Sequence, residues 1–264
     1  MYISRNQTEN AVKNMQQFYS SLRKVYADSG MNVEEDLGRR NILMSGPQEY
    51  YFAEQIKSNF PNAYNNGKTG EPDIVIPEIS KNLECKLTTR HRSGALSFQS
   101  DSMTFEGNKD GVDFLYVVAD DYFEKFAVLH FEGLVRDDFH VESPGARGRV
   151  RMKKHVAMDK CNVLMGNVVD RRNEFISQYE VELNSVSQSR AERIASLNSR
   201  LTKETPAKAN KTVKIINREL VRFSKKMNRI NEKISLWKSK NPSYTVVLEN
   251  IDGDNICQNS TYAA

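Results

Sequence analysis

Apolar residues near the N-terminus recur at steps of three and four, which is the period of an amphipathic helix. Within residues 8–28 they are Val12, Met15, Tyr19, Leu22 and Tyr26. A second helix is predicted to begin after Ser45-Gly46, with Pro47 in its first turn, where proline's missing amide proton costs nothing. Its inward side chains would be Tyr51, Phe52, Ile56 and Phe60. The chain is therefore expected to open with two amphipathic helices.

Short β-rich runs then replace the helical period. They are residues 73–77, 83–89, 114–119, 126–131 and 162–165. The first two follow a turn signature at residues 65–68 and are separated by a predicted turn at Ser80-Lys81-Asn82, so they are expected to be neighbouring antiparallel strands. The acidic pair Asp120-Asp121 marks a further turn. The first 170 residues are therefore predicted to form a mixed α/β domain.

Beyond Asp170 the pattern becomes that of two long helices separated by Thr205-Pro206. The first stripe is Phe175, Tyr179, Leu183, Val186, Ile194, Leu197 and Leu201. The second is Val213, Ile216, Leu220, Phe223, Met227, Ile230, Ile234 and Trp237. The first stripe is broken only by Arg190, and the second proceeds in steps of three and four without exception, which is a heptad seam. We therefore expect an antiparallel helical hairpin whose two stripes bury each other.

Composition limits the class of protein. With 264 residues, 39% hydrophobic and 27% charged, the chain has ordinary globular usage, which excludes a collagen or a disordered protein. No apolar run approaches the length of a membrane helix and no signal pattern opens the chain, so a cytoplasmic protein without membrane contact is expected. Cys85, Cys161 and Cys257 form no CxxC pair and are expected to be free thiols.

Charge is concentrated in the predicted hairpin. Residues 171–240 contain 17 Lys and Arg against 7 Asp and Glu, a net +10, whereas the whole chain carries only +4. Such a segment is typical of a protein that binds a polyanion, because Lys and Arg displace the counterions of nucleic acid. A solvated helical face is the alternative. On the outer face, Arg222 and Lys226 are the candidate DNA contacts.

One short region contains the residues for phosphodiester chemistry. Pro72-Asp73 is followed, after ten residues, by Glu84-Cys85-Lys86. On adjacent strands the two carboxylates would lie within a few ångströms, and Glu84 and Lys86 would share one face. Carboxylate oxygens are the ligands that Mg²⁺ prefers, and a bound metal can activate water against a phosphate. The spacing alone is weak, and an exposed cross-strand ion pair is the alternative.

In these residues the chain resembles the PD-(D/E)xK nuclease superfamily and, within it, the type II restriction endonucleases. The resemblance covers residues 45–119 and rests on the motifs and their order. It implies a Mg²⁺-dependent enzyme that cuts both strands of DNA, commonly as a homodimer. It implies Asp73, Glu84 and the carbonyl of Cys85 as metal ligands, with Lys86 orienting the water. Glu49 would be the accessory acid of the preceding helix.

Glu54 lies on the same helix, and the sequence leaves open which of the two acids reaches the hairpin. The expected fold is α/β (α+β), a mixed-sheet core resembling restriction endonucleases, followed by the long helical hairpin. The expected domains are a nuclease core with N-terminal helices over 1–170, the basic hairpin over 171–242, and a tail or strand packed on the core over 243–264. The hairpin would grip DNA, mediate dimer contacts, or both.

Candidate DNA contacts lie outside the acidic motif. A basic segment holds Arg147, Arg149, Arg151, Lys153 and Lys154, of which the four at odd positions would share one side of a strand. Arginine reads guanine in the major groove, whereas lysine more often contacts phosphate. Arg90 and Arg92 leave the catalytic strand and form a second candidate. Gln99 resembles a polar residue that some superfamily members carry after the Lys strand, with a structural role as the alternative.

The predicted function is site-specific cleavage of double-stranded DNA by a homodimeric, Mg²⁺-dependent type II restriction endonuclease. A structure-specific or repair nuclease resembling junction resolvases, and a non-catalytic DNA-binding module, are the alternatives. The four histidines show no metal-binding spacing and there is no glycine-rich phosphate loop, so no nucleotide cofactor is expected.

Overall fold

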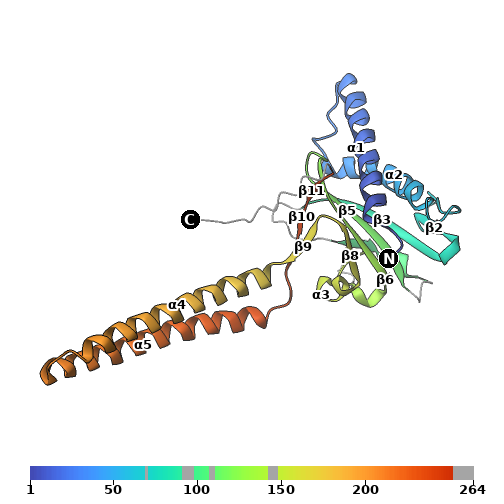
Figure 1. Cartoon of the computed structure of the whole chain (residues 1–264). Coiled ribbons are helices and arrows are strands. Elements are labelled where there is room, and N and C mark those ends of the chain that lie inside the picture. Colours follow the sequence, from blue (N-terminus) through green and yellow to red (C-terminus); the bar gives the residue numbers. More distant parts are fainter. Residues whose placement is uncertain (69–70, 91–97, 107–110, 142–147, 252–264) are drawn as a thin grey trace. The chain divides into compact units, whose positions relative to one another are not determined.

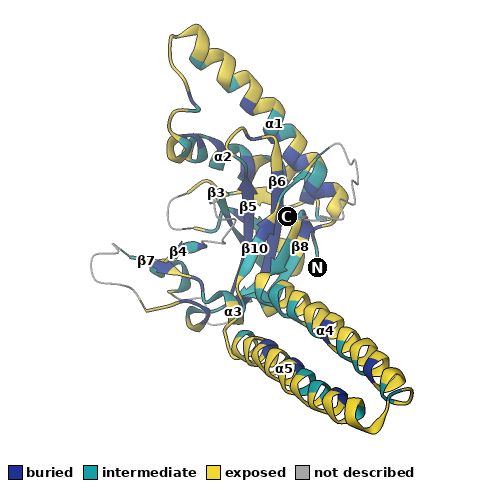
Figure 2. Ribbon diagram, turned by 90° about the vertical axis from the view of Figure 1, so that its left-hand side faces the viewer, coloured by how far each residue is buried: buried dark blue, intermediate teal, exposed yellow. Residues whose placement is uncertain are grey.

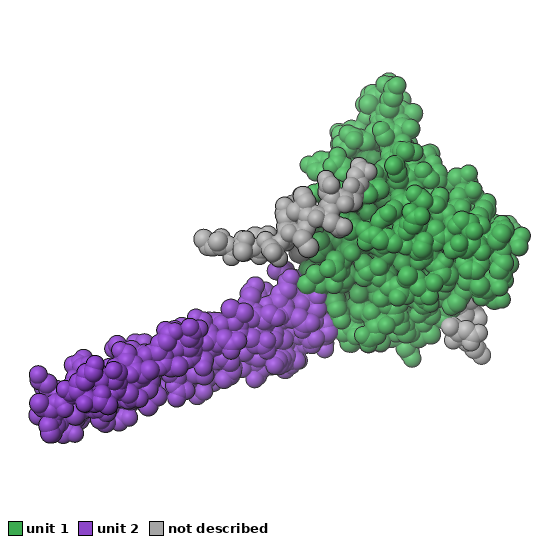
Figure 3. All heavy atoms as spheres, viewed as in Figure 1, with its two compact units in different colours: residues 1–169, 244–264 green, residues 170–243 purple. Residues whose placement is uncertain are grey.

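The computed structural model describes residues 1–68, 71–90, 98–106, 111–141 and 148–251 (Figure 1). The chain divides into two units, coloured separately in Figure 3: residues 1–169 with 244–264, and residues 170–243. The first unit contains a mixed sheet of seven strands, and the second is a long helical hairpin. The predicted fold class, a mixed α/β protein with a long C-terminal helical hairpin, is confirmed.

The helices of the described residues are α1 (Arg5–Asp28), α2 (Leu37–Ile56), α3 (Lys154–Ala157), α4 (Arg171–Leu201) and α5 (Pro206–Lys238). The strands are β1 (Tyr64–Asn65), β2 (Ile74–Ile76), β3 (Lys81–Thr89), β4 (Gln99–Asp101), β5 (Val112–Ala119), β6 (Lys125–Leu134), β7 (Arg149–Arg151), β8 (Cys161–Met165), β9 (Asn167–Asp170), β10 (Tyr244–Val247) and β11 (Glu249–Asn250). Short 3-10 helices are η1 (Pro77–Ile79), η2 (Ser102–Phe105), η3 (Arg136–Asp138) and η4 (Met158–Lys160). None of the described helices combines the length and apolarity needed to cross a membrane.

The main sheet has the order β1-β2-β3-β5-β6-β11, with β8 also paired to β6. Only β3 and β5 run parallel, and the other pairs are antiparallel. The predicted hairpin of β2 and β3 is confirmed, with Ile74 opposite Leu83. Two-stranded ribbons are formed by β4 with β7 and by β9 with β10. The described part of the predicted C-terminal tail thus contains strands, and β11 extends the core sheet.

Different elements cover the two faces of the sheet. On one face, α1 and α2 bury a cluster that includes Met15, Phe52, Leu83 and Cys85. On the other face, the β4–β7 ribbon and α3 pack over a second cluster that includes Phe114, Tyr116 and Phe131 of β5 and β6. Because successive residues of a strand point to opposite faces, the apolar odd positions of β3 meet the helices and its charged even positions do not.

The predicted start of the second helix was wrong. α2 begins at Leu37, and the Asp36 side chain caps it by accepting from the amide of Arg39 at 3.0 Å. Gly46 and Pro47 lie inside the helix. The missing amide of Pro47 removes one hydrogen bond, and the burial of Met44 in the helix-covered core offsets that loss.

The predicted turn at Ser80-Lys81-Asn82 is also displaced. The reversal lies in η1 and ends at Ser80, whose φ of 52° is left-handed. Lys81 already belongs to β3. The fixed φ of Pro77 favours the tight 3-10 turn directly after β2, and this moves the reversal toward the N-terminus.

The two long helices form the hairpin that the heptad pattern predicts. Val186, Phe223, Ile230 and Ile234 are buried between them, as Figure 2 shows by residue burial. At the start of α5 the seam differs from the prediction. Val213 is 42% exposed and Thr212 is buried instead, because the Thr212 hydroxyl donates to the Glu204 carboxylate at 2.5 Å.

A fully buried arginine fastens α2 to the end of the sheet. Arg40 donates to the carbonyls of Asp120 and Asp121 at 3.1 and 2.6 Å, and to the hydroxyl of Thr89 at 2.8 Å. Its guanidinium also lies 5.2 Å from the ring centre of Phe123. A buried charge of this kind stabilises the fold only while all of its partners are present.

We therefore expect Arg40→Met to lower the free energy of unfolding by about 3 kcal/mol, because the carbonyls of the β5–β6 turn lose their donors in a buried setting. Arg39→Met is the matched control, since the Arg39 side chain is 73% exposed and its ion pair with Asp36 is long, at 4.0 Å. Urea unfolding of both variants measures the difference. Equal losses would show that Arg40 is not the anchor.

Candidate active site

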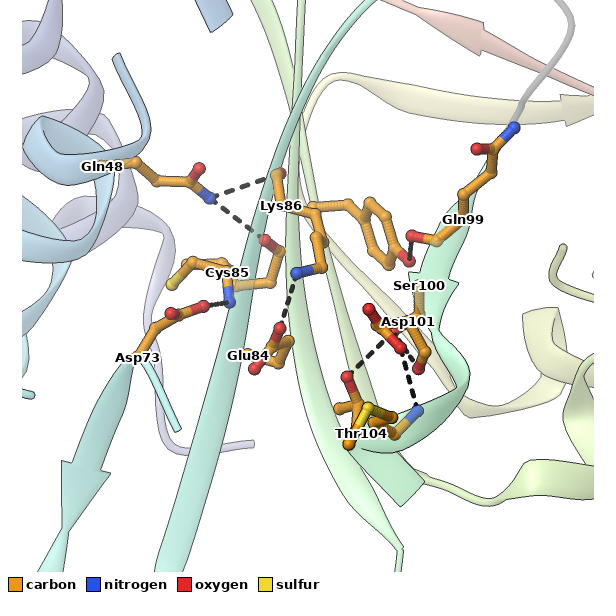
Figure 4. A network of polar contacts seen from close by, with 12 residues as sticks. Gln48, Asp73, Glu84, Cys85, Lys86, Gln99, Ser100, Asp101 and Thr104 are labelled. Atoms are coloured by element: carbon orange, nitrogen blue, oxygen red, sulfur yellow. Dashed lines mark hydrogen bonds and ion pairs between the residues drawn. The ribbon is translucent and has the colours of Figure 1, made fainter. Parts of the chain in front are cut away.

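Asp73 lies directly before β2, at the same level of the β2–β3 hairpin as Glu84 of β3. Ile74 faces Leu83 in the β2–β3 register, so the next facing pair is Asp73 and Glu84. An Asp73 carboxylate oxygen accepts the backbone N–H of Cys85 at 2.7 Å, which ties the start of β2 to the middle of β3 (Figure 4). The two acids of the predicted motif are therefore brought together.

Lys86 shares its face of β3 with Glu84. Its ammonium lies 2.5 Å from a Glu84 carboxylate oxygen, and these side chains are 32% and 15% exposed. Burial alone would lower the pKa of Lys86, but the carboxylate of Glu84 outweighs it and the pKa is raised. The lysine therefore stays protonated beside the acids, as an ion pair partly withdrawn from water.

The structure distinguishes the two acids of α2. Burial, followed by repulsion from Asp73 and Glu84, raises the pKa of Glu49 to about 7. Glu54 instead forms an ion pair with Lys57 at the surface. Glu49 is therefore the acid that faces the β2–β3 hairpin. Glu54 points elsewhere, because helix residues five positions apart point in different directions.

Negative charge exceeds positive charge at this place. Burial and the neighbouring Glu84 raise the pKa of Asp73 to about 6, against the lowering effect of the Cys85 amide and Lys86. Three carboxylates thus surround a single ammonium. Repulsion between neighbouring carboxylates lowers the stability of the fold. Such crowding is therefore typical of sites that hold a cation or a proton for function.

Gln48 is a site residue that the sequence analysis did not identify. It is fully buried, and its side-chain amide donates to the carbonyl of Leu115 at 3.1 Å and to that of Lys86 at 3.4 Å (Figure 4). It therefore clamps β3 to β5 directly beneath the lysine. A buried Gln next to Glu49 on a helix gives no sequence signal, because only the tertiary structure places it between strands.

Tyr116 connects the carboxylate site to the β4–β7 ribbon. It is the partner of Lys86 in the β3–β5 register, and its hydroxyl donates to the carbonyl of Gln99 at 2.9 Å. Burial raises the pKa of Tyr116 well above its ordinary range, so the hydroxyl keeps its proton. This bond holds β4 next to the face that carries Glu84 and Lys86 (Figure 4).

The ribbon exposes two of the predicted DNA contacts on one side. Gln99 faces Arg151 and Asp101 faces Arg149, whereas Val150 points inward and is buried. Both arginines are exposed, and they lie two positions apart with Val150 between them, as the predicted alternation requires.

The same alternation does not continue to the two lysines. β7 ends at Arg151, because the next residue is buried and bridges to Phe139. The chain then turns into α3, where the Lys153 ammonium donates to the carbonyl of Asp137 at 2.9 Å. Burial lowers the pKa of Lys154. Lys153 therefore lies beyond β7, against η3, and does not continue the alternation of the two arginines.

The remaining predicted positions lie elsewhere. Arg90 donates to the carbonyl of Val246 at 3.1 Å and so contacts the C-terminal segment. Arg92 and Arg147 lie outside the described residues. Arg222 and Lys226 are exposed on α5, and Arg222 pairs with Glu219 at 3.1 Å.

Cys85 offers only its backbone to this site. Its thiol is buried on the helix-covered face, and burial raises its pKa far above that of a reactive cysteine. Cys85 and Cys161 are free thiols, and Cys257 lies outside the described residues.

The donor set suits Mg²⁺ better than a transition metal. Within the described residues, no group of three or more His, Cys, Asp or Glu side chains forms a preformed cage for a metal. Mg²⁺ does not require one, because it is usually held by one or two carboxylates together with waters and a substrate phosphate. Asp73 and Glu84 supply oxygen ligands of this kind, and the excess of negative charge favours a cation there.

Comparison of the chain with protein-family models, curated proteins and solved structures found no match.

The raised pKa of Glu49 makes stability depend on pH. The folded protein holds the proton of the Glu49 carboxyl more tightly than the unfolded chain does. The stability that this proton contributes is therefore fully present below pH 4.5 and is lost as the pH rises through about 7. We expect Glu49→Gln to raise the free energy of unfolding at pH 8 by about 1–2 kcal/mol after allowance for solvent screening, and by less at pH 5.

Urea unfolding at the two pH values measures this effect. Glu54→Gln removes the same charge from the same helix, at the exposed pair with Lys57, and is the matched control. A stabilisation of equal size in the control, or none in Glu49→Gln, would contradict the crowding of acids around Glu49.

Proposed function

We propose that this chain is a Mg²⁺-dependent endonuclease of the PD-(D/E)xK kind that cuts double-stranded DNA at specific sites. The observation that carries the proposal is the convergence of Asp73 and Glu84 from neighbouring strands, with Lys86 paired to Glu84 on the same face. Two oxygen ligands and one ammonium next to each other are the groups that hydrolysis of a phosphodiester requires.

In this proposal each side chain has one role. Asp73 and Glu84 would hold the metal, and the carbonyl of Cys85 would be a further ligand. When bound, Mg²⁺ stabilises charge on the scissile phosphate and lowers the pKa of a bound water. Lys86 would donate from its ammonium to orient the attacking water, and Glu49 would act as the accessory acid.

Gln48 and Tyr116 would act by positioning. Gln48 fixes the backbone of Lys86 against β5, and would so help to keep the lysine in place beside the carboxylates that would hold the metal. Tyr116 holds β4, and with it the β4–β7 ribbon, at the same face. Rigid support of this kind matters because small displacements of reacting groups lower rates strongly.

Recognition of DNA would fall to the ribbon beside the site. A two-stranded ribbon fits the major groove, where arginine reads guanine and glutamine reads adenine. Arg149, Arg151 and Gln99 point to this task by residue type and by their place in the register. A homodimer would present two such sites to the two strands of a palindromic sequence. We place the enzyme in the cytoplasm, in keeping with its free thiols.

The first test is cleavage. Incubation of plasmid DNA with Mg²⁺ should give discrete fragments, and Asp73→Ala should lower the rate at least about 1,000-fold, because a metal ligand worth several kcal/mol is lost. The variant should still bind DNA. Glu54→Ala is the control, since Glu54 is an acid of α2 that pairs with Lys57 at the surface and is not a proposed ligand.

Other outcomes would overturn the proposal in distinguishable ways. Cutting of branched substrates alone would identify a structure-specific nuclease of junction-resolvase type. DNA that is retarded in a gel but never cut would identify a binding module. Full activity in Asp73→Ala and Glu84→Ala would remove the carboxylates from the mechanism.

The second test concerns base reading. Arg151→Gln should slow cleavage of the preferred site by about 5–150-fold, the equivalent of about 1–3 kcal/mol for one bidentate contact with a base. Lys153→Gln removes the same charge two residues away, where the ammonium already contacts the Asp137 carbonyl, and should change the rate little. Digestion of DNA of known sequence measures both. Equal effects would mean that only the net charge of this segment matters.

A further inference from the structure

The net positive charge of the hairpin belongs almost entirely to α5. α5 carries ten Lys and Arg against two Glu, a net +8, whereas α4 carries five Arg against four Glu, a net +1. The two helices share the same seam, so packing does not require this difference. The asymmetry therefore indicates a task for the outer surface of α5.

The cations of α5 form one continuous flank. Seven exposed side chains follow one another at steps of three and four, which keeps them on one side of a helix. They are Lys211, Lys214, Arg218, Arg222, Lys225, Arg229 and Lys233. The opposite flank of the same helix is exposed and uncharged at Asn217, Ser224, Asn228, Asn231 and Ser235. We name the first set the cationic flank.

Most of the cationic flank has no partner within the described residues. Arg222 pairs with Glu219, and the Lys233 ammonium lies 5.0 Å from the ring centre of Tyr179. The other five form no ion pair in the described part of the chain. In contrast, other cations of the hairpin are paired: Arg193 with Glu219, Arg200 with Glu204, and Lys238 with Glu180. Unpaired like charges repel one another, and the fold gains nothing from them.

We propose that the cationic flank of α5 binds the phosphate backbone of duplex DNA without reading its sequence. From Lys211 to Lys233 a helix extends about 33 Å at 1.5 Å per residue, which matches one turn of the double helix. Lys and Arg on a straight, rigid support would neutralise successive phosphates along this length.

Other partners suit the flank less well. A membrane surface requires an apolar face beside the cations, but the apolar face of α5 is buried against α4. Contact between the cationic flanks of two copies of the chain would bring like charges together. The inference uses only the hairpin, so it stands whether or not the carboxylate site cuts DNA.

The test is the salt dependence of binding by the full chain to a 30-base-pair duplex without divalent ion, measured by fluorescence anisotropy. Arg218→Gln, Lys225→Gln and Arg229→Gln are combined in one variant. We expect the slope of log affinity against log salt to fall by about 2–3, since each phosphate contact contributes about 0.9. Affinity at about 0.1 M salt should drop at least tenfold.

The matched control combines Arg193→Gln, Arg200→Gln and Lys238→Gln, which removes the same charge from cations that are already paired. Its slope should change by less than about one. Circular dichroism checks that both variants keep their helices. If the slope of log affinity against log salt changes equally in the flank variant and in the control variant, the inference is overturned, even if cleavage is observed.

Two competitors decide the kind of partner. Poly-glutamate and vesicles rich in phosphatidylserine should bind the wild type weakly and show little difference between the variants. An equal loss for these polyanions would also overturn the inference, because the flank would then be a general anion binder. Loss confined to the duplex supports it, even if the protein never cuts DNA.

Discussion

The alternation of β3 is the constraint on which the structure depends. One strand must present Leu83 and Cys85 to the helix-covered core while it presents Glu84 and Lys86 to the opposite face. Its parallel pairing with β5 puts apolar and aromatic side chains next to those charges, and this withdraws them partly from water. Charges in such a place interact strongly, because low polarity increases both attraction and repulsion. The ion pair of Glu84 and Lys86 and the crowding of Asp73 and Glu49 are two results of this one arrangement.

The supporting contacts make the site rigid at some cost. Gln48 uses its amide group on two strands, but its side-chain oxygen has no hydrogen-bond partner within the described residues. Asp73 accepts a backbone amide and still faces another carboxylate. Groups that lower the stability of a fold in this way are more frequent at functional sites than elsewhere in a protein. In the helix-covered core, by contrast, the buried Arg40 has several hydrogen-bond acceptors around it.

The two units solve different physical problems. The mixed sheet brings together residues distant in sequence, as Tyr116 of β5 and Gln99 of β4 show. The hairpin repeats one local pattern over more than 30 residues in each helix, and so produces an extended surface on which α5 carries a net charge of +8. An extended array suits a regular polymer, whereas a compact cluster suits one chemical group. The proposed function needs both: one chemical group to cut and a long polyanion to hold.

The sequence by itself determined the elements whose pattern is local: α1, the heptad seam of α4 and α5, the order of β2 and β3, and the shared face of Glu84 and Lys86. Periods of two and of three to four residues follow from backbone geometry, so they can be read without tertiary contacts. Only the tertiary structure decided where α2 begins, and that Glu49 and not Glu54 faces the β2–β3 hairpin. It also decided that Gln48 joins two strands and that Lys153 contacts the Asp137 carbonyl. These outcomes depend on which buried neighbours each residue meets, and that information is spread over segments far apart in the chain.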